Sequence, residues 1–186
     1  PTRAEVGDVA NAALSSVDAV MLSAETASGR YPVKAVDMMD SILREIEAYQ
    51  LKHNCFSDNK SKVENRISSE REAVSCAVTL LTQSLDLEAI IVPTRSGTTA
   101  MALASDRPVS PLVAVCPDSR VCRRLMLHWG VMSFNLANKM TRNWKQMSKD
   151  ITRRCLKGEK GNSILFVSGF NDLAELNEPV IKLVRM

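Results

Sequence analysis

The sequence predicts an α/β fold: an open, mainly parallel, five-stranded sheet with helices on both faces, preceded by a helix–strand–helix segment. After residue 69, short apolar runs alternate with helical patterns, as they do in βα units with right-handed crossovers. A polar stretch separates this part from the first 50 residues. The last two apolar runs have no helical pattern between them, so we expect one of these strands to be antiparallel at the sheet edge.

Residues 1–50 contain two helical patterns around one apolar run. Thr2 and Glu5 have the spacing of a capping box, which predicts a helix that begins after Thr2. Residues 18–23 form a short, mostly apolar run, which is typical of a strand buried on both faces. Pro32 then suits the first turn of a second helix, whose apolar residues recur three or four positions apart.

Residues 51–68 are the predicted boundary between two domains. This segment is rich in Lys, Asn, Ser, Asp and Glu and has few apolar residues, a composition typical of an exposed connection. It divides residues 1–50 from residues 69–186. A second capping box, Ser69 with Glu72, predicts the helix that opens the second domain.

The second domain is predicted to hold five strands and three further helices. The apolar runs that predict strands cover residues 89–92, 112–115, 131–136, 163–168 and 180–184. The helical patterns cover residues 98–105, 119–127 and 141–156.

Composition restricts the kinds of partner. The chain has 186 residues, of which 45% are hydrophobic and 24% charged, and its formal net charge is only +3. With 4% aromatic residues and no strong basic excess, we expect no nucleic-acid partner. No apolar run is long enough for a membrane span and no signal peptide is recognisable, so we expect a soluble protein of the cytoplasm, with an organelle such as a plastid as the alternative.

The cysteines and histidines do not suggest a metal site. The five cysteines are widely spread and none lies in a C-x-x-C pair, which favours reduced thiols. The two histidines are expected to be solvated or packed rather than bound to metal.

The strongest candidate site is the loop T-R-S-G-T-T-A at residues 94–100, which follows an apolar strand and opens a helix. Hydroxyls, a glycine and backbone amides at such a place can cradle an anion, although the lysine of a Walker A loop is absent. The alternative is a turn whose hydroxyls merely cap the helix. The candidate phosphate-binding residues are Thr94, Arg95, Ser96, Gly97, Thr98 and Thr99.

Two other groups are weaker candidates. Arg120, Arg123 and Arg124 follow the next strand and could supply a second contact to a phosphate, but we favour their interpretation as the solvated face of a helix. Ser23 and Glu25 lie at the carboxyl end of the predicted strand at residues 18–23. In a barrel of parallel strands this is the catalytic face, whereas elsewhere such residues usually cap the next element.

Most of the sequence resembles one known family, pyruvate kinase. The end of that family's barrel domain is closely similar to P-T-R-A-E-V at residues 1–6, D-V-A-N-A at residues 8–12, M-L-S-A-E-T-A at residues 21–27 and Y-P-V at residues 31–33. The family's carboxyl-terminal regulatory domain is similar to the loop at residues 94–100, R-R-L at residues 123–125 and W-G-V at residues 129–131.

The resemblance implies a phosphotransferase that moves the phosphoryl group of phosphoenolpyruvate to ADP, with magnesium and potassium. Residues 1–50 would then be the end of a (β/α)8 barrel, and residues 69–186 a complete effector-binding domain. Ser23 and Glu25 match active-site positions with supporting roles that shape the pocket. The family's lysine, paired acidic metal ligands and phosphate-binding arginine would precede Pro1, so we expect no metal ligands and no activity in this chain alone.

The resemblance also implies an allosteric sugar phosphate bound at residues 94–99 and a homotetramer. Asp172 and Glu175 stand where members activated by bisphosphates carry a basic residue, and their charge would repel a second phosphate. A monophosphate is therefore favoured. The alternatives are a non-catalytic sugar-phosphate-binding module resembling sugar isomerase domains, and an interaction domain whose loop binds nothing.

Overall fold

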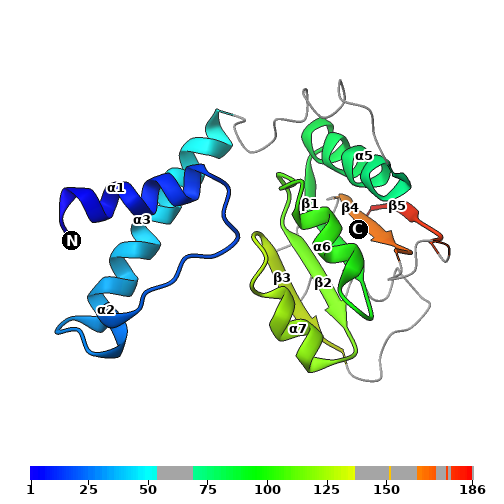
Figure 1. The fold of residues 1–186 in the computed structure, drawn as a ribbon. Helices are drawn as coiled ribbons and strands as arrows, with labels where there is room; N and C mark the ends of the chain where they lie inside the picture. The colour runs from blue at the N-terminus through cyan, green and yellow to red at the C-terminus, as the bar shows by residue number, and fades with distance from the viewer. Residues whose placement is uncertain (54–68, 137–150, 152–162, 171–174, 176, 186) are drawn as a thin grey trace. The chain divides into compact units, whose positions relative to one another are not determined.

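A computed structural model describes residues 1–53, 69–136, 151, 163–170, 175 and 177–185 (Figure 1). The chain divides into two compact units, Pro1–Phe56 and Ser57–Met186. Among the described residues, no helix is long and apolar enough to cross a membrane.

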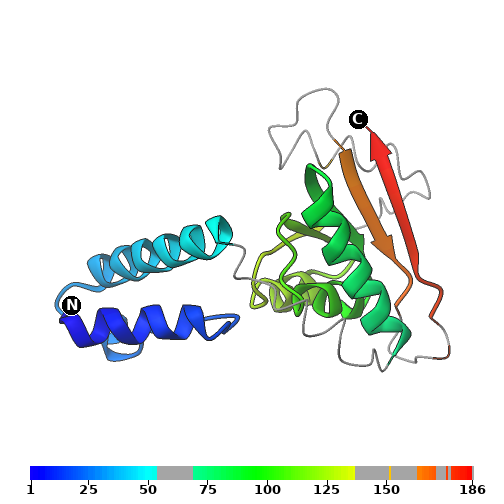
Figure 2. The ribbon, with the colours of Figure 1, turned by 90° about the horizontal axis from the view of Figure 1, so that it is seen from above.

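The first unit is built from helices. These are α1 (Arg3–Leu14), the single turn α2 (Ala24–Ala27) and α3 (Pro32–Lys52). The capping box is confirmed, because Thr2 Oγ1 accepts from Glu5 N at 3.3 Å and Glu5 Oε2 accepts from Thr2 N at 2.7 Å. Pro32 lies in the first turn of α3, where the helix needs no N–H donor. Figure 2 shows α1 and α3 running side by side, and the two helices are in contact.

The strand predicted at residues 18–23 is not formed. The segment has no strand partner, and every strand in the described part of the chain belongs to the sheet of the second unit. Met21 is 85% exposed, so the apolar run is not buried on both faces as its composition suggested. The prediction failed because an apolar run indicates a tendency to be buried, whereas a strand also needs neighbours that satisfy its backbone groups.

The second unit alternates strands and helices as predicted. Its elements are α5 (Glu70–Ser84), β1 (Leu87–Pro93), α6 (Thr98–Ala104), β2 (Leu112–Cys116), α7 (Ser119–Leu125), β3 (Val131–Asn135), β4 (Ser163–Ser168) and β5 (Val180–Arg185). Ser69 caps α5, its hydroxyl accepting from Glu72 N at 3.2 Å. The helix predicted over residues 141–156 lies outside the described residues except for Ile151.

The five strands form one sheet in the order β3-β2-β1-β4-β5. Neighbouring strands are parallel except for β4 and β5, which confirms the antiparallel edge. The chain thus adds β2 and β3 on one side of β1 and then returns to add β4 on the other side (Figure 1).

Both faces of the sheet are buried, and β1 contributes to both. Ile90 and Val92 belong to a cluster with apolar residues of α5, α6 and α7. Ala89 and Ile91 belong to a second cluster on the opposite face, where the helical residue Ile151 is buried. The predicted α/β class is confirmed, with α5, α6 and α7 packed against one face and the helical residue Ile151 against the other.

Two leucines that face each other across the β4–β5 ladder should differ greatly in how much they contribute to stability. Leu165 is 1% exposed, whereas its register partner Leu183 is 47% exposed. Replacing Leu165 with alanine leaves a cavity in the first cluster and should cost about 2–5 kcal/mol of unfolding free energy. Urea unfolding followed by tryptophan fluorescence tests this in the second unit, because both tryptophans of the chain, Trp129 and Trp144, lie there.

Leu183→Ala is the matched control. Because half of its side chain already meets solvent, the loss should stay below about 1 kcal/mol. Equal losses for the two variants would contradict the placement of the core.

Cys116, at the end of β2, is predicted to be an unreactive thiol. Burial, together with a hydrogen bond to the Cys122 side chain, raises the pKa of Cys116 from 9.0 to about 12, which lowers its thiolate fraction below pH 9 about a thousandfold. Iodoacetamide at pH 8.5 should therefore label Cys116 only after unfolding, as mass spectrometry can show. Because the folded state raises this pKa, the stabilising contribution of the thiol is complete below about pH 9 and is lost as the pH rises towards 12.

Candidate functional site

The predicted phosphate loop follows β1, where the strand order reverses. In open α/β sheets, ligands bind outside the carboxyl ends of the strands at this reversal. The loop that follows β4 lies at the same edge, and the two loops are in contact, because Thr99 Oγ1 donates to the carbonyl of Phe170 at 3.4 Å. The six candidate residues at positions 94–99 therefore lie at the edge where ligands generally bind in open α/β sheets.

Thr94 and Gly97 shape the turn at the start of the loop. Thr94 is 5% exposed, and its Oγ1 accepts from Gly97 N at 2.9 Å. Gly97 has φ +94°, a left-handed conformation that glycine adopts without strain. A Cβ at this position would come within 3.1 Å of Leu125 Cδ2. Thr94 therefore holds the turn closed, and the glycine lets α7 approach it.

Ser96 and Thr98 bring two hydroxyls together. Their oxygen atoms are 2.8 Å apart, a hydrogen-bonding distance. Ser96 is half-buried, and Thr98 is 8% exposed. Each hydroxyl can donate one proton and accept others, so the pair can turn both protons towards an anion.

Arg124 contacts this loop from α7. Its Nη2 donates to the carbonyl of Ser96. All three arginines, Arg120, Arg123 and Arg124, are exposed, as predicted for the solvated face of a helix, and Arg124 in addition bonds to the loop. Arg123 is exposed, and Arg120 lies near Asp118, with Nε 4.0 Å from Oδ1. The sequence offered one indication of the role of Arg124. Leu125 is the apolar residue of that helical turn and is buried against the loop, so the residue next to it, Arg124, lies at the edge of the contact between α7 and the loop.

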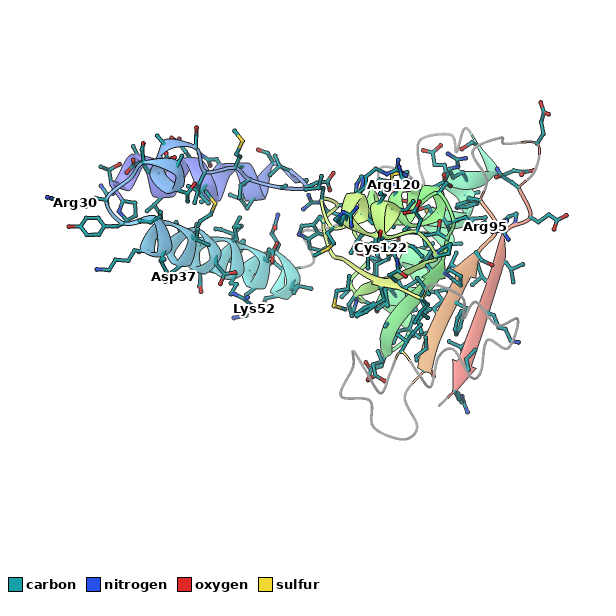
Figure 3. All side chains as sticks on the ribbon, turned by 90° about the horizontal axis from the view of Figure 1, so that it is seen from below. Arg30, Asp37, Lys52, Arg95, Arg120 and Cys122 are labelled. Carbon is teal, nitrogen blue, oxygen red and sulfur yellow. The ribbon has the colours of Figure 1, made fainter. Side chains whose placement is uncertain are left out.

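Arg95 differs from the rest of the loop in being exposed. Figure 3 shows it at the edge of the sheet where β4 ends and β5 begins, with Arg120 at the start of α7. A guanidinium at this edge can form charge-assisted hydrogen bonds to a phosphate. Of the acidic residues expected nearby, Glu175 is exposed and Asp172 lies outside the described residues.

Ser23 and Glu25 lie together in the first unit. Ser23 N donates to Glu25 Oε2 at 2.9 Å, so the carboxylate caps the start of α2, and both side chains are exposed. Glu25 also lines a cavity of about 680 Å³ between the helices of this unit, together with apolar residues such as Val9 and Ile42. The Glu25 carboxylate therefore bonds to the backbone just before α2 and also borders the cavity.

A metal centre is not apparent among the described side chains. No three His, Cys, Asp or Glu residues in this part of the chain lie close enough together to hold an ion. His53 ends α3, with its Nδ1 2.8 Å from the carbonyl of Tyr49.

Comparisons with known proteins match two separate parts of the chain. A family model described as the pyruvate kinase alpha/beta domain matches residues 72–178, and one described as the pyruvate kinase barrel domain matches residues 1–36. Pyruvate kinase 2 of Synechocystis is 44% identical over 131 residues, which are 70% of this chain and 21% of that protein. The pyruvate kinase of Borreliella burgdorferi is 37% identical over 179 residues, 91% of this chain and 35% of that protein.

The chain thus spans between about a fifth and about a third of the length of these relatives. The alpha/beta-domain match alone covers more than half of the 186 residues and includes the loop at residues 94–99, β1 and Arg124. This chain belongs to the pyruvate kinase family.

Proposed function

We propose that this chain is part of a glycolytic phosphotransferase that transfers the phosphoryl group of phosphoenolpyruvate to ADP, giving pyruvate and ATP. The support is the family membership and the barrel-domain match over residues 1–36, which includes Ser23 and Glu25. Those two residues would shape the pocket. Magnesium and potassium would supply charge neutralisation for the transferred group, held by residues outside this sequence.

The second unit would bind a phosphate-bearing effector at residues 94–99. The observation that carries this proposal is the paired hydroxyls of Ser96 and Thr98, 2.8 Å apart at the edge where the strand order reverses. A merely capping loop has no need of two hydroxyls that bond to each other. Arg95 would supply positive charge, while Arg124 would hold the Ser96 carbonyl away from the anion.

The favoured effector is a monophosphate, such as a sugar phosphate or a nucleotide, rather than a bisphosphate. Glu175 is exposed after β4, where it would oppose a second phosphate. Effector binding would be coupled to the active site within a homotetramer, and such couplings are typically about 1–3 kcal/mol.

The competing proposal, a non-catalytic sugar-phosphate-binding module, accounts for the loop equally well. It gives no role to residues 1–36, which match the barrel domain of a kinase family. We therefore favour the enzyme.

Ser96→Ala should weaken phosphate binding without unfolding the loop, because Ser96 is half-buried and its hydroxyl bonds only within the loop. In the wild-type chain, a monophosphate at about 100 times its dissociation constant should stabilise the fold by about 2.7 kcal/mol. The variant should lose most of this stabilisation at the same ligand concentration. Thermal shift with ribose 5-phosphate, glucose 6-phosphate, AMP and inorganic phosphate measures it.

Ser105→Ala is the matched control, since Ser105 lies just after the other end of α6, where its Oγ donates to the carbonyl of Ala102 at 2.7 Å. The Ser105→Ala variant should show the same ligand-induced increase in thermal stability as the wild type. Thr94→Ala is less suitable, because Thr94 also holds Gly97 in place. If no phosphate compound stabilises the wild-type chain, the effector proposal is wrong.

The 186-residue chain by itself should not turn over phosphoenolpyruvate and ADP. It spans at most about a third of the length of these relatives, and phosphoryl transfer needs a full set of positioned charges. A coupled assay for pyruvate, with an intact pyruvate kinase as the positive control, should give the rate of a protein-free blank. Magnesium-dependent turnover by this chain would show that the catalytic groups lie within it.

A further inference from the structure

The side chain of Thr99 bridges two loops that are far apart in the sequence. It is 1% exposed, and its hydroxyl donates to the Phe170 carbonyl across 71 positions. The distance of 3.4 Å is long for an O–H···O bond, for which about 2.7–2.8 Å is usual. The bond is therefore weak, although it is shielded from water.

Phe170 follows a glycine whose backbone lies against the residues that precede β5. Gly169 has φ +104°, and a Cβ there would lie 1.8 Å from the carbonyl oxygen of Glu178. Glu178 N in turn donates to Gly169 O at 2.9 Å. The ring of Phe170 is 6% exposed, so both its backbone and its side chain are enclosed.

Phe170 also contacts the first turn of α5. The Cζ atom of Arg71 lies 5.7 Å from the centroid of the Phe170 ring, within the range of a cation–π interaction. Helix α5 is the first element of the second unit, and it is joined to α6 by the bond from Ser75 Oγ to the Ala102 carbonyl, at 3.1 Å. A change at Phe170 can therefore reach the start of α5 through Arg71.

We infer that Thr99 is a positioning residue whose single hydroxyl proton is shared between the Phe170 carbonyl and a bound phosphate, so that phosphate binding releases Phe170 and loosens the first turn of α5. This inference rests on the proposed phosphate site. A hydroxyl has one proton to donate, and a phosphate dianion can only accept. The two acceptors therefore compete for the same proton.

The phosphate should win this competition. Hydrogen bonds from a hydroxyl to an anionic oxygen are about 2.5–2.7 Å long and about twice as strong as neutral ones, whereas the bond to Phe170 is 3.4 Å long. A carbonyl that loses its donor in an enclosed site must find another partner. Phe170 therefore has to shift, and the contact of Arg71 with its ring weakens.

Hydrogen exchange of the whole chain, with inorganic phosphate or with chloride at equal ionic strength, tests the inference. The reporters are the amides of Glu72 and Ala73, which bond to the side chain and the carbonyl of Ser69. Phosphate should speed their exchange at least about two- to fivefold, because the cation–π contact between Arg71 and Phe170 would be lost. Thermal shift in the same buffers reports whether phosphate binds.

Substitutions of Thr99 show whether an effect of phosphate on α5 depends on the Thr99 hydroxyl or reflects a general loosening of the fold. In the Thr99→Val variant, the amides of Glu72 and Ala73 should already exchange fast without phosphate, and phosphate should not increase their exchange rates further. Thr99→Ser retains the hydroxyl and should behave as the wild type. Ser133→Ala is the matched control, since it removes a hydroxyl that donates to the Cys122 carbonyl at 2.7 Å, and it should leave the phosphate effect intact.

A second pair of variants serves if Thr99→Val does not fold. Phe170→Leu should also remove the phosphate effect at α5, whereas Phe134→Leu, in β3 and packed against the second cluster, should not. Phosphate that stabilises the wild type without changing exchange at α5 would overturn this inference and leave the binding site standing. If phosphate does not stabilise the wild type at all, both this inference and the proposed phosphate site are wrong.

Discussion

The backbone pairing of β1 on both of its edges is the constraint on which the second unit depends. Parallel neighbours, β2 and β4, satisfy its N–H and C=O groups, and its apolar side chains fill clusters on both faces. A strand enclosed in this way meets solvent only at its ends. Polar residues that follow its carboxyl end are therefore brought to the edge where the strand order reverses, and the loop at residues 94–99 owes its place to this enclosure rather than to its own contacts.

Much of the fold could be predicted because burial and periodicity are local properties. The apolar run at residues 89–92 lies within β1 (Leu87–Pro93), and the run at residues 163–168 coincides with β4. The segment at residues 18–23 has an equally apolar run but no strand partner, and it remains without a ladder. Sequence patterns show which side chains are apolar, whereas the pairing of a strand depends on which other segments are available to hydrogen-bond with it.

The candidate loop could be predicted from its residue types, but the roles of its members could not. Thr94 and Ser96 look alike in the sequence, yet the first holds the turn and the second belongs to a hydroxyl pair. The contribution of Arg124 and the bond from Thr99 to Phe170 depend on contacts between elements that the sequence separates by 28 and 71 positions. No local pattern specifies such partners.

The peptide bond between Ser96 and Gly97 is fixed from both sides. Its N–H donates to Thr94 Oγ1, and its carbonyl accepts from Arg124. A peptide plane held at both ends cannot rotate without breaking two hydrogen bonds, so the free loop already has the backbone geometry that it would present to an anion. A phosphate bound as proposed would then have little backbone entropy to remove, and its affinity would be governed by desolvation and by the reorientation of hydroxyl protons.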